Sequence, residues 1–356
     1  MVALRRISIW CSIVSITLIE VVSHFGTFSI DSPQYIELSL FFKGELNKLS
    51  DWGQYRLLLR PLIPYLASLL YPAIDFRIIY TMLNTVFLII AGLAIYALTK
   101  QLFDERTGFY AALLMLTSFP LIVWGPSILT DAAGLAFTLL GYLLVLQTFT
   151  KRGINKYTYL GGWLVGIGIL ARETVLSVCL FALLYALWRR NFKQLLVFLI
   201  SALIIPLSWW LLNFFKITLP NWTEWLTLNP FTTISLAFFA HRVPGILAII
   251  GFLSVEEKHV FKTWILILIA TTIPWFVFIG NIRLTILLYP ATMIMAAIGL
   301  KAVSENISKK PILGKINTNI WAAMLLILTM IDGNYQAWEL LGCKFLFPWE
   351  EPISIP

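Results

Sequence analysis

Apolar stretches about 20 residues long recur along the chain, and each can cross the roughly 30 Å hydrocarbon core of a membrane as an α-helix. The chain is 59% hydrophobic and 12% charged, whereas a soluble domain is about 45–50% apolar and about 25% charged. No polar segment is long enough to fold alone. We therefore predict an all-α fold, a polytopic membrane helical bundle in which residues 1–356 form a single domain.

Eleven membrane spans are predicted, and some of them are short. They cover residues 7–25, 76–98, 108–124, 128–149, 157–172, 174–188, 195–215, 243–254, 263–279, 284–303 and 318–337. Lys and Arg are concentrated in alternate short loops, as they are on the cytoplasmic side of membrane proteins. This bias predicts a cytoplasmic N-terminus. It also accounts for the net charge of +8 through loops that face anionic lipid, without nucleic acid as a partner.

The connection after the first span is unusually long and is predicted to be extracytoplasmic. It covers residues 26–75 and contains Asp31-Ser-Pro-Gln-Tyr35 and Arg60-Pro-Leu-Ile-Pro-Tyr65. Each motif places a proline where the first turn of a helix accepts one. Two short surface helices are therefore expected, from Pro33 to about Phe42 and from Leu62 to Tyr71. Arg60 would contact either a substrate or lipid headgroups.

Asp31 precedes the first of these two helices, and Ser32 is the expected N-cap. The positive end of the helix dipole favours an ionised carboxylate at this position. Such a group at the membrane surface can accept a proton from a hydroxyl or amine, or can help to hold a divalent metal. The alternative is a capping or solvated acid without a chemical role.

Three other charged positions lie at the predicted outer ends of spans. Asp131 begins the fourth span, with Thr130 able to cap it. Arg172 and Glu173 form the tip between the fifth and sixth spans, and Arg283 begins the tenth. Arginine suits phosphate because it is planar, permanently charged and a multidentate donor. The alternatives are helix capping for Asp131, a local Arg172–Glu173 ion pair, and an Arg283 side chain that reaches lipid headgroups.

A second long extracytoplasmic loop is predicted over residues 216–242. It is rich in aromatic residues and ends in His241 and Arg242. A loop of this composition can form a lid or a platform for a sugar. It can equally be an interfacial segment with no chemical role.

The order of these motifs resembles that of GT-C superfamily glycosyltransferases, in the prokaryotic branch similar to protein O-mannosyltransferases and aminoarabinose transferases. The similar pieces are Asp31 to Tyr35, Arg60 to Tyr65, Thr130-Asp131 with the following span, Gly168 to Glu173, and Arg283 with Tyr289-Pro290. The resemblance covers roughly residues 1–300, and each motif is short.

The resemblance implies transfer of a sugar from a polyprenyl-phosphate donor to an acceptor outside the cytoplasm, at the cell membrane. The acceptor, whether protein, lipid or glycan, is left open, and so is a divalent metal as cofactor. The resemblance implies Asp31 as a base or metal ligand, Asp131 as a second acid, and Arg172 and Arg283 as residues that face the carrier phosphate. We add Arg60 as a further candidate ligand of the donor phosphate, and Tyr35, His241 and Arg242 as candidate substrate-binding residues.

Two departures from the family pattern keep other functions open. Many members have two adjacent acids in the first loop, whereas Ser32 follows Asp31 here, and a sizeable C-terminal soluble domain is not expected. A transporter or lipid flippase would explain polar residues within spans but would leave the long first loop unexplained. A catalytically silent subunit of a membrane complex would explain the missing second acid.

Overall fold

The computed structural model is almost entirely helical. The structure describes residues 2–23, 28–29, 31–150, 153–214, 230–255, 258–277, 282–310, 317–340 and 354–355. The chain divides into two compact units. Unit 1 comprises residues 1–23, 92–123 and 228–345, and unit 2 comprises residues 24–91, 124–227 and 346–356. The prediction of a single domain over residues 1–356 stays a prediction.

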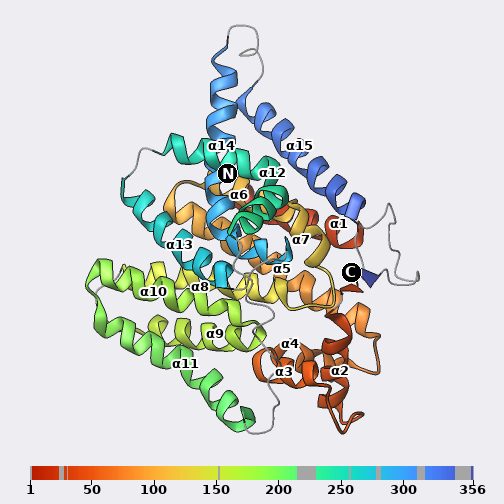
Figure 1. Ribbon diagram of the computed structural model, residues 1–356. Helices are drawn as coiled ribbons and strands as arrows, with labels where there is room; N and C mark the ends of the chain where they lie inside the picture. Colours follow the sequence, from red (N-terminus) through yellow and green to blue (C-terminus); the bar gives the residue numbers. More distant parts are fainter. Residues whose placement is uncertain are drawn as a thin grey trace. The chain divides into compact units, whose positions relative to one another are not determined.

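Unit 2 contains the first loop, which forms three helices rather than the two expected. These are α2 (Ser32–Lys43), α3 (Asp51–Leu59) and α4 (Leu62–Leu70), which lie together in Figure 1. Helix α2 ends at Gly44, which adopts the left-handed conformation (φ 84°) that favours glycine. Helix α3 begins after Ser50, whose side chain accepts a hydrogen bond from Gly53 N. Helix α3 was not predicted because its sequence has no clear apolar periodicity.

Helix α3 is packed into unit 2 rather than lying on a surface. Leu57 joins Leu38 of α2 and Leu49 in a small buried cluster, against which Trp209 packs. The indole nitrogen of Trp209 also donates to Leu57 O at 2.9 Å. Trp209 lies on α11, so the first loop is fixed to one of the long apolar helices of its own unit.

The rest of unit 2 is built from helices that match predicted spans. They are α8 (Asp131–Phe149), α9 (Lys156–Ala171), the short 3-10 helix η1 (Glu173–Val175), α10 (Leu176–Arg189) and α11 (Phe192–Phe214). Helix α9 packs against α8 and α11. Helix α5 (Phe76–Leu102) begins in unit 2 and ends in unit 1. Two-residue strands β1 (Phe28–Ser29) and β2 (Ser354–Ile355) pair in parallel.

Unit 1 holds the remaining helices. They are α1 (Val2–Ser23), α6 (Glu105–Leu116), α7 (Phe119–Trp124), α12 (Pro230–Ser254), α13 (Lys258–Val277), the 3-10 helix η3 (Ile282–Leu288), α14 (Tyr289–Ser308) and α15 (Thr318–Leu340). The predicted span 108–124 is not one continuous helix, because the helix breaks between α6 and α7. Ser118, at this break, donates to the Tyr289 hydroxyl at 2.7 Å.

The predicted loop at 216–242 is also partly wrong. Residues 216–229 lie outside the described residues, but α12 already begins at Pro230. The helix kinks at Arg242, where φ is 10° and ψ is −99°. Pro244 explains the kink, because a proline inside a helix removes one backbone hydrogen bond and clashes with the preceding turn.

Among the described residues, four helical segments are long and apolar enough to cross a membrane: 76–102, 131–149, 192–214 and 285–308. Helix α11 also exposes a stripe of large apolar side chains, at Leu196, Ile200, Ile204, Leu207 and Leu211. An exposed stripe of this kind is compatible with lipid contact and unfavourable in water. The prediction of an all-helical integral membrane protein is therefore supported. The number of spans and the orientation stay predictions.

Candidate functional site

Three arginine–carboxylate pairs come together in unit 2, and all of their members except Asp31 are buried. We call Asp31, Arg56, Arg60, Asp131, Arg172 and Glu173 the arginine–carboxylate cluster. Its members come from the N-terminus of α2, from α3, from the α3–α4 junction, from the start of α8, and from the turn after α9. Arginine and carboxylate side chains are seldom buried unless they are paired, so these six positions need an explanation.

Asp31 is the N-cap residue of α2, but its side chain makes no capping hydrogen bond. The expectation that Ser32 caps this helix is therefore wrong. Ser32 is the first helical residue, and its hydroxyl accepts from Ser29 N and donates to Ile128 O. The Asp31 carboxylate instead lies 3.1 Å from Arg56 Nη2, with 18% of the side chain exposed. The Asp31 carboxylate is therefore partly exposed at the surface of the protein.

Arg60 ends α3 and precedes Pro61, the N-cap of α4. Its Nε lies 2.6 Å from Glu173 Oε2, and its Nη2 contacts Glu173 Oε1. Its Nη1 donates to the Tyr35 hydroxyl at 2.8 Å. The two-point ion pair fixes the plane of the guanidinium, and Arg60 therefore does not point away toward headgroups.

Arg172 pairs with Asp131 rather than with its neighbour Glu173. Its Nη1 lies 2.7 Å from Asp131 Oδ2, and both side chains are 3% exposed. The same nitrogen is 3.4 Å from the Thr130 hydroxyl. The local Arg172–Glu173 pair that was considered as an alternative is therefore not formed. Thr130 makes no side-chain cap to α8, and its hydroxyl lies 3.4 Å from that of Tyr35.

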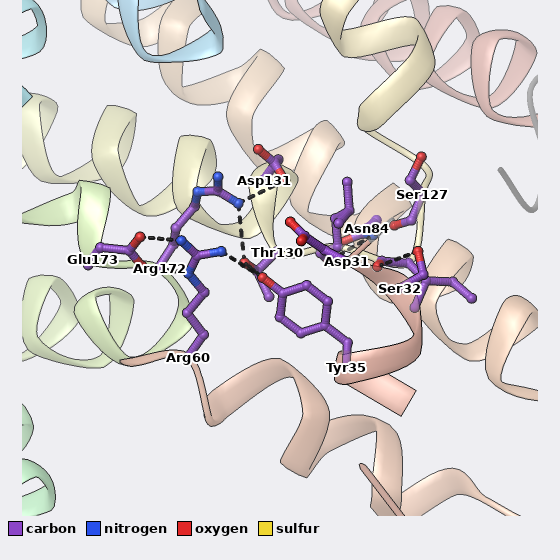
Figure 2. A network of polar contacts seen from close by, with 12 residues as sticks. Asp31, Ser32, Tyr35, Arg60, Asn84, Ser127, Thr130, Asp131, Arg172 and Glu173 are labelled. Carbon is purple, nitrogen blue, oxygen red and sulfur yellow. Dashed lines mark hydrogen bonds and ion pairs between the residues drawn. The ribbon is translucent and has the colours of Figure 1, made fainter. Parts of the chain in front are cut away.

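The contacts of Arg60, Tyr35, Thr130, Arg172 and Glu173 form a continuous network, which Figure 2 shows from close by, and the Asp31–Arg56 pair adjoins it at the Tyr35 ring. In this network, Arg60 donates both to the Glu173 carboxylate and to the Tyr35 hydroxyl. The Tyr35 hydroxyl contacts the Thr130 hydroxyl, which in turn accepts from Arg172. Two guanidinium groups therefore face a pair of hydroxyls, and each guanidinium also contacts a carboxylate.

The segment that carries Thr130 and Asp131 is held in place by its backbone. Asn84 of α5 donates through Nδ2 to Ser127 O at 2.6 Å and to Leu129 O at 3.3 Å. The Ser32 hydroxyl donates to Ile128 O at 3.1 Å, so that α2 and α5 together position residues 127–129 (Figure 2). Buried carbonyl groups need such partners, and their partners here place the start of α8 beside Asp31.

Gly134 makes room for Arg172. A Cβ atom at this position would lie 2.6 Å from Arg172 Cδ and 3.0 Å from its Cβ. The side-chain stem of Arg172 therefore runs directly along the first turn of α8. A larger residue at Gly134 would have to displace it.

The charges of the cluster change the titration of its members. Burial opposes ionisation of Glu173, but Arg60, assisted by Arg172, outweighs it and lowers the pKa of Glu173 to about 2. Burial similarly opposes the charged form of Arg60, yet Glu173 raises the pKa of Arg60 well above its ordinary value. For Tyr35, burial is outweighed by Arg56, Arg60 and Arg172, and the pKa is lowered. The environment of the Tyr35 hydroxyl is therefore positive.

Five predicted site residues meet in this network: Asp31, Tyr35, Arg60, Asp131 and Arg172. Their chemical roles stay predictions. Arg283 lies in η3 of unit 1, and its side chain is outside the described residues. His241 and Arg242 also belong to unit 1. His241 is buried with its ring 5.1 Å from that of Tyr289, and Arg242 Nη1 lies 3.8 Å from Asp332 Oδ1.

Sequence reasoning missed Arg56, and it considered only the adjacent Arg172 as a partner of Glu173. Arg56 lies four residues before Arg60, one helical turn away, and this spacing on a helix would have indicated a shared face. Because helix α3 itself was not predicted, the spacing of Arg56 and Arg60 did not indicate a shared face. For Glu173, the adjacent arginine suggested a local pair, whereas its carboxylate contacts Arg60, 113 positions away.

A divalent metal finds no ready-made ligand set among the described residues. They contain no group of three or more His, Cys, Asp or Glu side chains able to hold an ion. The acids of the cluster are instead paired with arginine.

The comparisons with known proteins agree with the resemblance seen in the motifs. A family model described as dolichyl-phosphate-mannose-protein mannosyltransferase matches residues 61–212. ArnT from Cupriavidus metallidurans, solved with undecaprenyl phosphate, matches with a TM-score of 0.63 at 12% identity, over 93% of this chain and 70% of that chain. A search of curated protein sequences gives no significant match.

The archaeal oligosaccharyltransferase AglB from Archaeoglobus fulgidus, solved with an inhibitory peptide and a dolichol-phosphate, matches with a TM-score of 0.60 at 13% identity. This match covers 92% of the present chain but only 56% of AglB. The chain therefore shares its fold with ArnT and AglB, which agrees with the GT-C resemblance of its motifs. The part of the chain that the family model matches begins directly after Arg60 and contains Asp131, Arg172 and Glu173.

Proposed function

We propose that this protein transfers a sugar from a polyprenyl-phosphate donor to an acceptor on the extracytoplasmic side of the membrane. The observation that carries the proposal is the meeting of Asp31, Arg60, Asp131 and Arg172 in one buried network, although they come from four separate parts of the chain. Structural matches to proteins solved with undecaprenyl phosphate and dolichol-phosphate support the class of donor.

In the proposed reaction, the donor phosphate lies against Arg60 and Arg172. Both guanidinium groups are buried, where an ionic contact is much stronger than in water. Each now contacts a carboxylate, so the phosphate oxygens exchange with those carboxylates or share the guanidinium hydrogens with them. Arg283, on η3, is the third proposed phosphate ligand, as its position in the family motif implies.

The acceptor hydroxyl or amine attacks the anomeric carbon of the sugar. The bond from that carbon to the phosphate oxygen breaks, and its electron pair stays on the polyprenyl phosphate. Arg60 and Arg172 stabilise the charge that develops there. Asp31 takes the proton that the acceptor loses. Asp131 orients Arg172, and is the second candidate for the base.

Tyr35 would contact the donor phosphate or the sugar through its hydroxyl, which lies between the two arginines. His241 and Arg242 are proposed to contact the sugar or the acceptor from α12. The identity of the sugar, hexose or pentose, and of the acceptor are not part of the proposal.

The test uses the purified full chain in lipid nanodiscs. It is incubated with a panel of radiolabelled polyprenyl-phosphate hexoses and pentoses, together with membrane extract as the source of acceptor. The expected result is release of polyprenyl phosphate and transfer of label from at least one donor. Asp31→Asn should lower both by about 10²–10⁴-fold. Asp75→Asn, which alters an exposed carboxylate of the same loop, should leave both unchanged. Absence of transfer with every donor would contradict the proposal.

A further inference from the structure

Arg56 contacts the proposed base and was not suggested by any sequence motif. It lies on α3 with 8% of its side chain exposed, and its Nη2 is 3.1 Å from Asp31 Oδ1. Its guanidinium carbon lies 5.4 Å from the ring centroids of both Tyr35 and Tyr55. Two aromatic contacts and one ion pair leave the guanidinium little freedom to reorient.

The first loop does not need Arg56 to hold its shape. Helices α2 and α3 are already connected through Glu37, whose carboxylate accepts from Ser50 N and from the Ser50 hydroxyl, each at 2.6 Å. Helix α3 is connected to α11 through the bond from Trp209 to Leu57 and through the apolar cluster described above. The guanidinium of Arg56 is instead directed at Asp31 and at the two tyrosine rings.

Tyr35 connects this arginine to the phosphate side of the network. Its ring lies beside Arg56, while its hydroxyl accepts a hydrogen bond from Arg60 Nη1 at 2.8 Å. The Asp31–Arg56 pair and the Arg60–Glu173 pair are thus two separate ion pairs that share one tyrosine. Each pair can serve a different step of a transfer reaction.

We propose that Arg56 is a positioning residue for Asp31. Its guanidinium places a positive charge beside the carboxylate and holds it in one orientation, so that Asp31 meets the acceptor as it loses its proton. The inference rests on the proposed function, and it predicts that Arg56 acts on turnover through Asp31 rather than on donor affinity.

A double-mutant cycle tests this dependence. It compares wild type, Arg56→Met, Asp31→Asn and the double variant, with the transferring donor from the panel above. Methionine keeps much of the side-chain volume and removes the charge. Arg56→Met should lower turnover by roughly 10–100-fold, the range expected for a displaced catalytic group, with the donor KM unchanged. Arg56→Lys should restore part of the turnover. In the Asp31→Asn background, Arg56→Met should cause no further loss.

A control variant keeps the comparison specific. Arg189 of α10 also lies over two aromatic rings, at 5.8 Å from Tyr185 and 5.2 Å from Trp188, but it is not in the network. Arg189→Met should therefore leave turnover unchanged. Multiplicative losses in the double variant would show that Arg56 acts independently of Asp31, and would overturn the inference.

A second measurement needs no sugar donor. A hydrophobic carbodiimide modifies protonated carboxyl groups, and mass spectrometry locates the modified residues. Arg56→Met should increase modification of Asp31 severalfold and leave that of Asp131 unchanged, because Asp131 keeps Arg172 as its partner. Increased modification in a protein that transfers no sugar would contradict the proposed function but support the role of Arg56. Unchanged modification of Asp31 would overturn the role of Arg56.

Discussion

Arg60 and Glu173 are 113 positions apart in the chain and form a two-point ion pair that is almost fully buried. The pair joins the first loop to the turn after α9, and it aims Arg60 Nη1 at the Tyr35 hydroxyl. Since neither residue would be stable at this depth alone, the position of each depends on the other.

Glu173→Gln is expected to destabilise the protein and to lower donor affinity. Removing one partner of a buried pair leaves the other charge uncompensated, and this costs about 3–5 kcal/mol. Thermal unfolding in detergent, together with binding of undecaprenyl phosphate, measures both effects. Glu37→Gln is the control. Glu37 lies on α2 of the same loop, and its carboxylate contacts Ser50 rather than Arg60. The donor affinity of Glu37→Gln should match that of wild type.

The Arg60–Glu173 pair also predicts a pH dependence of stability. The pKa of Glu173 falls from its ordinary 4.5 to about 2, so that folding favours the ionised carboxylate. Its contribution is complete above the ordinary pKa and is lost as the pH falls from about 4.5 toward 2. The difference in melting temperature between wild type and Glu173→Gln should therefore shrink over this interval. A difference that stays constant down to pH 2 would contradict the ion pair.

Asp31→Asn should preserve the fold and donor binding but lower turnover by about 10²–10⁴-fold, the usual contribution of a general base. Asparagine is nearly isosteric and is itself a good N-cap, so a capping role would leave both stability and turnover intact. Transfer rate and thermal stability are measured on the same preparations. If turnover stays near that of wild type, Asp131 becomes the leading candidate for the base.

Arg60→Ala, Arg172→Ala and Arg283→Ala should each weaken binding of a polyprenyl-phosphate donor. A hydrogen bond to a charged group contributes about 1.5–3 kcal/mol, which corresponds to roughly a 10–100-fold loss of affinity. The matched control is Lys43→Ala, an exposed basic residue in the last turn of α2. Equal affinity in wild type and all three arginine variants would remove these residues from the donor site.

Gly134→Ala should displace Arg172 without touching any polar group directly. The added methyl group would lie 2.6 Å from Arg172 Cδ, and such overpacking costs about 1–3 kcal/mol. Donor affinity should fall with stability. Gly161→Ala on α9 is the control, because its nearest contact would be an ordinary 3.4 Å. It should be neutral or slightly stabilising, since alanine favours helix more than glycine does.

Much of the helical architecture follows from the sequence alone. Each of the eleven predicted spans overlaps a described helix, because an apolar stretch of that length in a membrane must satisfy its backbone hydrogen bonds internally. Pro33 and Pro61 indicated correctly where α2 and α4 begin, since the conformation of proline suits a first helical turn. These signals depend only on residues close together in the chain, so the helices they predict are also present in the tertiary structure.

The tertiary structure decided which charges pair. Arg172 and Glu173 are neighbours, but Arg172 adopts an extended backbone (φ −161°, ψ 130°) between α9 and η1. Successive side chains on an extended backbone point in different directions, so Arg172 reaches Asp131 while Glu173 reaches Arg60. Packing likewise determined helix α3 and the position of Arg56 on it. This helix packs against α2 and α11, and its own sequence has no clear apolar periodicity. The sequence by itself determined where the helices lie, whereas the partners of the buried charges depended on contacts between residues far apart in the chain.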